Sequence, residues 1–249
     1  MVKGIESFRE HFKDYTDCYT VIGGAACDIL MTDADFDFRA TKDIDMILVL
    51  EDRYQEFARL FWEYIKDGGY RCGWKNNDDV HFYRFTDPKP GYPIQIELFS
   101  RKPDYKLDVA EGIIPIHISD DVSSLSAILL NDDFYRFMME GREVRNGICV
   151  LDAVHLIPFK MFAWLNLTDR KARGEHVNDR DLKKHKNDVF RLTEIIVPET
   201  RVPVQGAVAD IVDRFLERII DEPLSLQDLR LAVTKEQALN LISNYFIKT

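Results

Sequence analysis

Two aspartates at the start of an apolar run have the spacing that binds a divalent cation. Asp43 and Asp45 open a predicted strand over 44–50. Alternate residues of a strand point to the same face, so both carboxylates lie on one side and Ile44 on the other. Two neighbouring carboxylates repel each other unless a cation lies between them, and Mg²⁺ is typically held by one or two carboxylates plus substrate phosphates. The pair therefore predicts a site for Mg²⁺, or for Mn²⁺ in its place.

Two glycines precede the aspartates and follow a short apolar run. The pattern predicts a strand over 19–22, then Gly23 and Gly24, then a helix over 25–31. Glycines let the backbone approach a ligand closely, and the N–H groups at the start of a helix attract phosphate. Each half alone has an ordinary explanation, since Gly-Gly often forms a plain turn and Asp-x-Asp is often solvated or capping. Their order and strand context together favour a phosphate site beside a cation site.

If two metal ions bind beside the phosphate, a third acid is needed, because such sites use more than two carboxylates. The stretch 93–99 alternates in the manner of a half-buried strand, with Ile96 directed to the core and Glu97 to the other face. Glu97 is therefore the candidate third acid. The alternative is that Glu97 is a solvent-facing charge on a strand with one buried face.

An acidic segment between the glycines and the aspartates has the spacing of a calcium loop. Asp33, Asp35 and Asp37 alternate, but such a loop also needs Gly at its sixth position and Glu at its twelfth. Phe38 and Ile44 occupy those positions, so the pattern excludes a calcium loop. The segment is expected to be solvated or to form a flap beside the substrate.

The composition is that of an ordinary globular protein. The chain has 249 residues, 46% of them hydrophobic and 31% charged, which is enough for one large domain or two modest ones. No apolar stretch approaches the roughly 20 residues that span a bilayer, and the first residues do not form a secretory signal. Membrane association is therefore not expected. The cysteines lack C-x-x-C spacing and are interpreted as free thiols of the cytoplasm; they are Cys18, Cys27, Cys72 and Cys149.

Charge is distributed unevenly along the chain. The net charge of −10 argues against a broadly basic surface that binds nucleic acid. The stretch from Arg170 to Arg191, however, contains eight Lys or Arg and only four Asp or Glu. This basic stretch either meets a nucleoside triphosphate or an RNA end, or forms a solvated helix face with pairs along the helix.

The periodicity predicts an α+β domain over 1–150 and a helical domain over 151–249. The first is expected to be a small mixed sheet with helices, because strands and helices alternate along it. Its further helices are predicted over 5–15, 53–67 and 123–130, and its further strands over 80–85, 94–99, 113–118 and 144–150. The second domain is expected to hold a helix that begins after Asp152 and is kinked or restarted at Pro158, followed by helices over 179–196, 204–221 and 235–246.

Two lysines in the helical half are candidates for phosphate binding. Lys160 lies among the apolar residues of 159–163, where a lysine either extends its ammonium to the surface or is held as a cation near phosphate. On the charged helix, Lys184 and Asp188 are four residues apart and face the same way.

These features together resemble the AbiEii/AbiGii-type nucleotidyltransferases of the DNA polymerase β-like superfamily, which include abortive-infection and toxin–antitoxin toxins. The resemblance covers roughly 19–195. Its most specific part is 39–45, which matches the family's Arg-x-Thr-x-Asp-ϕ-Asp, where ϕ is apolar. The other matching parts are Gly23-Gly24, Ile96-Glu97-Leu98, the lysine helix 156–163 and the charged helix 181–192. One departure is the gap of eighteen residues between Gly24 and Asp43, which is longer than usual, and we interpret 32–39 as a loop insertion.

The resemblance implies a polymerase β-like nucleotidyltransferase domain followed by a helical domain. It also implies transfer of a nucleoside monophosphate from a nucleoside triphosphate to an acceptor hydroxyl, with RNA or tRNA among the expected acceptors and a cognate antitoxin among the expected partners. The implied metal-binding and catalytic residues are Asp43, Asp45 and Glu97. The implied nucleotide-binding residues are Gly23, Gly24, Thr41, Lys160 and Lys184, with Asp188 orienting Lys184 or the acceptor. Two alternatives stay open: a degenerate nucleotide-binding or interaction protein, and a drug-type enzyme with a small-molecule acceptor.

Overall fold

The chain, described by a computed structural model, is a mixed α+β protein. The structure describes residues 2–49, 53–72, 84–99 and 131–249. Their contacts gather in two compact units. Unit 1 joins the described residues before 100 to Arg142–Leu151, and unit 2 joins Asn131–Gly141 to Asp152–Thr249. The division near 151 lies beside the boundary expected at 150, but the segment Asn131–Gly141 belongs to unit 2.

Unit 1 is built on a mixed sheet. In the described ranges the sheet has seven strands in the order β3-β4-β5-β2-β1-β7-β6. The central strand β2 pairs antiparallel with β1 and parallel with β5. The strands are β1 (Tyr19–Ile22), β2 (Asp43–Leu48), β3 (Arg71–Cys72), β4 (Arg84–Thr86), β5 (Gln95–Phe99), β6 (Arg142–Arg145) and β7 (Ile148–Leu151).

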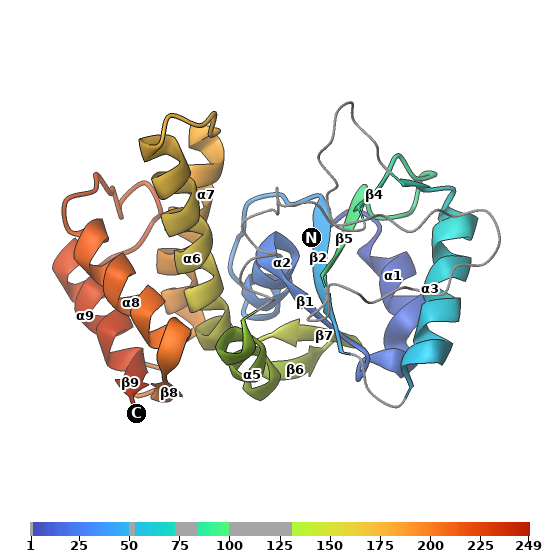
Figure 1. Cartoon of the computed structure of the whole chain (residues 1–249), viewed down its shortest axis with the longest axis horizontal. Helices are drawn as coiled ribbons and strands as arrows, with labels where there is room; N and C mark the ends of the chain where they lie inside the picture. The colour runs from blue at the N-terminus through green and yellow to red at the C-terminus, as the bar shows by residue number, and fades with distance from the viewer. Residues whose placement is uncertain (1, 50–52, 73–83, 100–130) are drawn as a thin grey trace. The chain divides into compact units, whose positions relative to one another are not determined.

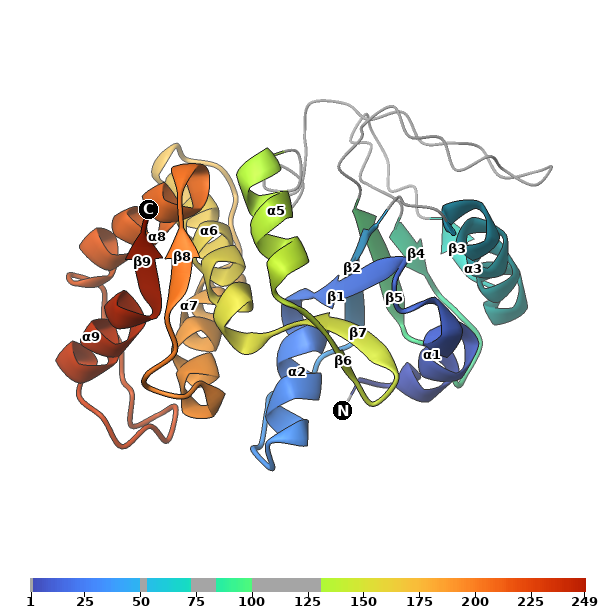
Figure 2. The same ribbon diagram turned by 90° about the horizontal axis from the view of Figure 1, so that it is seen from below.

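Helices cover both faces of this sheet. Helix α2 (Gly23–Asp33) lies on one face, and α1 (Ile5–Phe12) and α3 (Tyr54–Gly68) lie on the other (Figure 1). The view in Figure 2 shows the same three-layer order. Aromatic rings join α1, β1 and α3: Tyr19 contacts Phe57 at 5.9 Å between ring centroids. This packing leaves the α2 face of the sheet to carry the polar residues of β2 and β5.

Unit 2 is helical, with a small parallel strand pair. The long helix α6 packs against α7 and α8. Trp164 on α6 contacts Phe215 on α8 edge to face, with 5.3 Å between the ring centroids. Helix α5 belongs to this unit because Asp133 accepts a hydrogen bond from the Ala207 N–H at the start of α8. The helices are α5 (Asp132–Glu140), α6 (Ala153–Ala172), α7 (Asp179–Leu192), α8 (Gly206–Ile219) and α9 (Lys235–Tyr245); the strands are β8 (Val202–Val204) and β9 (Phe246–Lys248).

Several predicted elements differ from the structure. The single strand predicted over 144–150 is wrong, because Asn146 and Gly147 adopt φ values of 49° and 77° and turn the chain into the β6–β7 hairpin. Helix α6 continues through Pro158 without a restart. The helix predicted over 25–31 extends to Asp33, and the one predicted over 5–15 ends in a short 3₁₀ turn, Lys13–Tyr15. The elements predicted over 113–118 and 123–130, and the first part of the strand predicted over 80–85, lie outside the described residues.

The acidic segment after α2 is tied to the β6–β7 hairpin. Asp33 accepts a hydrogen bond from the Arg145 guanidinium at 3.3 Å and another from the Asn146 amide at 3.3 Å. Its carboxylate is therefore engaged by protein donors.

Candidate metal and nucleotide site

Asp45 and Glu97 lie side by side on neighbouring strands. β2 and β5 run parallel with Asp45 opposite Glu97 and Asp43 opposite Gln95. Adjacent strands are about 4.8 Å apart, and residues in register share a face. The three acids are half-buried, whereas Ile44 and Ile96 between them are fully buried on the opposite face. Alternation along two strands thus places three carboxylates on one surface.

Gly23 brings the start of α2 against the Asp45 carboxylate. Ile22, the last residue of β1, is the register partner of Asp45, so the chain enters α2 directly above that carboxylate. Gly23 has φ of +68°, a conformation that favours glycine. A Cβ at this position would overlap Oδ2 of Asp45. The absence of a side chain at Gly23 therefore leaves the space that the carboxylate occupies.

Gly24 is approached by the segment that leads into β2. A Cβ at Gly24 would lie 2.8 Å from Oγ1 of Thr41 and 3.4 Å from a terminal nitrogen of Arg39. Thr41 is buried, with 8% of its surface exposed. The segment 39–45 thus folds back along the start of α2. Arg39, Thr41 and Asp45 therefore lie beside the two glycines, although eighteen residues separate Gly24 from Asp43.

The start of α2 offers N–H groups without a side-chain cap. Ile22 precedes the helix and supplies no capping hydrogen bond, and the first turn contains no acidic residue. Unpaired N–H groups at a helix start carry partial positive charge and attract phosphate oxygens. A phosphate bound at the start of α2 would lie beside the three carboxylates, which repel it. The arrangement can therefore hold a phosphate only when a cation lies between the phosphate and the carboxylates.

Glu97 has two protein partners that the sequence did not indicate. Arg84 is its register partner across the antiparallel β4–β5 pair. Nε of Arg84 donates to Oε1 of Glu97 at 2.7 Å, and Nε2 of Gln95 donates to the same oxygen at 2.7 Å. The sequence predicts that Arg84 lies on the strand 80–85. It does not predict that Arg84 lies opposite Glu97, because that register depends on the pairing of two separate strands.

The three carboxylates are of the chemical type that binds a divalent cation. Carboxylate oxygens are the ligands that Mg²⁺ and Mn²⁺ prefer, and here they lie next to a glycine-lined backbone. Among the described residues, no three side chains of His, Cys, Asp or Glu gather closely enough to hold an ion. Oε1 of Glu97 is instead engaged by hydrogen bonds from Arg84 and Gln95.

In unit 2, Lys160 and Asp188 form a buried ion pair. Nζ of Lys160 lies 2.9 Å from Oδ2 of Asp188, and the exposed fractions of the two residues are 2% and 0%. The alternative in which Lys160 extends its ammonium to the surface is therefore wrong. Lys184, one turn before Asp188, is half-buried and has no partner among the described residues. Asp188 pairs with a lysine from α6 and not with the one on its own helix.

A cavity of unit 2 does not coincide with these residues. It has a volume of about 780 Å³ and lies between α6, α7 and the segment 222–229, and Trp164, Lys183 and Lys186 are among its lining residues. Lys160, Lys184 and Asp188 do not line it. Its lysines are largely committed, since Lys186 donates to the carbonyl of Pro223 at 2.8 Å and Lys171 to Asp179 at 2.5 Å.

The described cysteines are not arranged for catalysis or metal binding. Cys18, Cys27 and Cys149 are buried free thiols. Burial raises the pKa of Cys18 to about 11 and also raises that of Cys149, so both are protonated near neutral pH. Nucleophilic chemistry by these thiols is therefore not supported.

Neither the models of known protein families nor the curated protein sequences include a match to this chain. No helix in the described ranges is long and apolar enough to cross a membrane.

Proposed function

We propose that the protein is a metal-dependent nucleotidyltransferase of the polymerase β-like, AbiEii/AbiGii type. It would move a nucleoside monophosphate from a nucleoside triphosphate to an acceptor hydroxyl. The observation that carries this proposal is the convergence of Gly23, Asp45 and Glu97, from three separate segments, on one face of the unit 1 sheet. The buried free thiols favour a reducing compartment, so we place the activity in the cytoplasm.

The triphosphate would bind at the start of α2. Gly23 and Gly24 allow close approach of the backbone, and the uncapped N–H groups of the first turn face the phosphate oxygens. The Thr41 hydroxyl, 2.8 Å from the position that a Gly24 Cβ would take, can add a hydrogen bond. In unit 2, the charge of Lys160 is already balanced by Asp188.

Asp43, Asp45 and Glu97 would hold Mg²⁺ or Mn²⁺. When bound there, the metal supplies positive charge for the triphosphate and lowers the pKa of the acceptor hydroxyl. The acceptor oxygen then forms a bond to the α-phosphorus as the bond from that phosphorus to the β-phosphate bridging oxygen breaks, and pyrophosphate leaves. Asp45 or Glu97 accepts the proton of the hydroxyl. The chain forms no covalent bond to the substrate in this scheme and contributes positioning and charge.

A second function is favoured by the Arg84–Glu97 pair. A carboxylate already balanced by a guanidinium is less available to a metal, as expected in a nucleotide-binding protein that has lost its chemistry. Such a protein would still bind a triphosphate at α2, but it would transfer nothing to an acceptor.

Label transfer distinguishes these functions. The protein is incubated with Mg²⁺, a total cytoplasmic extract and each common ribonucleoside triphosphate labelled at the α-phosphate. The extract is then separated into RNA, protein and small molecules. Label in RNA supports an RNA or tRNA acceptor, and label in small molecules supports a drug-type enzyme. Triphosphate binding without label in any fraction supports the degenerate binding protein and overturns the proposed activity.

A further inference from the structure

Arg84 and Gln95 hold only one of the two oxygens of Glu97. Both donors reach Oε1 at 2.7 Å, one through the Arg84 guanidinium and one through the Gln95 amide. Oε2 has no hydrogen-bond partner in the described part of the chain. The Glu97 side chain is 13% exposed, against 38% for Arg84. A carboxylate that is mostly buried, fixed at one oxygen and open at the other, is oriented for a further ligand.

The open oxygen belongs to a row that crosses three strands. Arg84 on β4 is opposite Glu97 on β5, and Glu97 is opposite Asp45 on β2. Residues in register share a face, so the guanidinium, the carboxylate and the aspartate follow one another on the same surface. Arg84 therefore flanks Glu97 on the side away from Asp45.

We propose that Arg84 is a positioning residue that fixes Glu97 through Oε1 and leaves Oε2 for the metal shared with Asp45; this inference rests on the proposed function. Carboxylates that bind metals are commonly oriented by hydrogen bonds from an outer layer of side chains. Loss of such a partner typically lowers metal affinity by about 10–100-fold. Gln95 adds a second donor to the same oxygen.

Mn²⁺ binding, measured by titration calorimetry and by the free Mn²⁺ spin-resonance signal, tests this role without depending on turnover. The full chain is titrated with Mn²⁺ in the presence of a non-hydrolysable nucleoside triphosphate. Arg84→Gln is expected to weaken Mn²⁺ binding by about 10–100-fold. Arg84→Lys, which keeps the charge and one donor, is expected to restore part of the affinity. Arg71→Gln is the matched control, because it removes an exposed arginine without a described partner from β3 of the same sheet.

Two outcomes separate this inference from the proposed function. If Glu97→Gln weakens Mn²⁺ binding while Arg84→Gln leaves it unchanged or tightens it, Arg84 is a plain ion-pair partner or a competitor of the metal, and only the inference is overturned. If the wild-type chain binds no Mn²⁺, or if Glu97→Gln binds it as tightly as the wild type does, the proposed metal site fails as well. Should Arg84→Gln not fold, Gln95→Met removes the second donor to Oε1 and is expected to weaken Mn²⁺ binding in the same direction; unchanged affinity there also counts against the inference.

Discussion

Lys160 on α6 and Asp188 on α7 neutralise each other inside unit 2, with 2.9 Å between Nζ and Oδ2. Both side chains are removed from water, at 3% and 1% exposure. Removing one member of such a pair leaves an uncompensated buried charge, whereas replacing both with apolar groups is often tolerated. The pair therefore holds α6 to α7 only as long as both members are present.

Lys160→Met is expected to lower the free energy of unfolding by about 3–5 kcal/mol, because Asp188 loses the buried ammonium that contacts its Oδ2. The double variant Lys160→Met with Asp188→Leu is expected to regain most of that loss. Urea denaturation of the four members of this double-mutant cycle measures the coupling. Lys183→Met on the exposed side of α7 is the control and should stay within about 0.5 kcal/mol. Additive losses in the double variant would contradict a mutually compensating pair.

The double variant Asp43→Asn with Asp45→Asn is expected to abolish label transfer and to leave the melting temperature unchanged or raised. Removing two like charges held on one strand face relieves their repulsion, and neither side chain lies in the core. Label transfer and thermal melting are measured in parallel. Retained transfer would contradict the metal-site assignment, and a large loss of stability would indicate a structural role for the pair.

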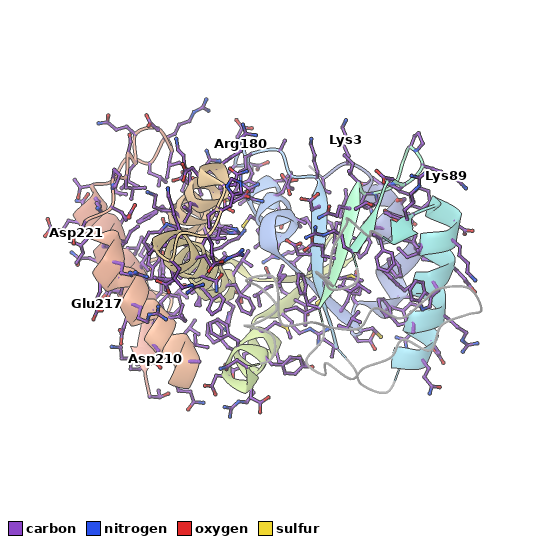
Figure 3. All side chains as sticks on the ribbon, turned by 45° about the horizontal axis from the view of Figure 1, so that its top comes forward. Lys3, Lys89, Arg180, Asp210, Glu217 and Asp221 are labelled. Atoms are coloured by element: carbon purple, nitrogen blue, oxygen red, sulfur yellow. The ribbon has the colours of Figure 1, made fainter. Side chains whose placement is uncertain are left out.

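The control for that variant removes the same number of charges elsewhere. Three exposed acids lie in this part of unit 2: Asp210 and Glu217 are on α8, and Asp221 is in the turn after it (Figure 3). Asp210→Asn with Asp221→Asn lowers the negative charge by the same amount, so transfer should persist. Loss of transfer in both double variants would point to net charge and not to a site.

Alternation within strands was enough to predict the polar face of the sheet. Asp43, Asp45 and Glu97 share it because residues two apart in a strand point the same way and Ile44 and Ile96 are buried between them. The partner of Glu97 could not be predicted in this way. Arg84 reaches it through the register of β4 with β5, which follows from the fold of the whole sheet and not from local spacing.

Local spacing also misjudged the charged helix. The four-residue separation of Lys184 and Asp188 indicated a pair along α7. In the structure Asp188 faces α6, and Lys160 takes its place as partner because a buried carboxylate requires a buried counter-charge. The hairpin at Asn146-Gly147 is a different case, since Asn-Gly is itself a strong turn signal and outweighs the apolar pattern that predicts one strand over 144–150.

The link between α5 and α8 predicts a dependence of stability on pH. The hydrogen bond from the Ala207 N–H, followed by the contact with Arg136, lowers the pKa of the Asp133 carboxyl below its usual range. An acid whose pKa is lower in the folded chain stabilises the fold above its unfolded pKa of about 3.9, and this contribution is lost as pH falls through the folded value. The difference in unfolding free energy between wild type and Asp133→Asn should therefore be largest at neutral pH and shrink below about pH 4.

Urea denaturation at a series of pH values checks this expectation. Glu217→Gln on the exposed side of α8 is the control, because it removes one acid from the same unit without touching a described partner. A difference between wild type and Asp133→Asn that stays constant from pH 7 to pH 3 would contradict the assigned role of the carboxylate.

Gly23→Ala separates the backbone role of this glycine from its role beside Asp45. Gly23 and Gly174 both have positive φ, 68° and 83°, so alanine at either position should cost about 1–2 kcal/mol of stability. At Gly174 the new Cβ meets nothing within 4 Å, whereas at Gly23 it overlaps the Asp45 carboxylate. That carboxylate ends a short side chain that can turn aside, so the two variants should lose similar stability. When the Asp45 side chain turns aside, however, the metal loses a ligand. Mn²⁺ affinity, measured with a non-hydrolysable triphosphate, should therefore fall in Gly23→Ala and stay unchanged in Gly174→Ala. Equal Mn²⁺ affinity in the two variants would show that the glycine serves the backbone turn alone and that Asp45 does not need its present position to bind metal.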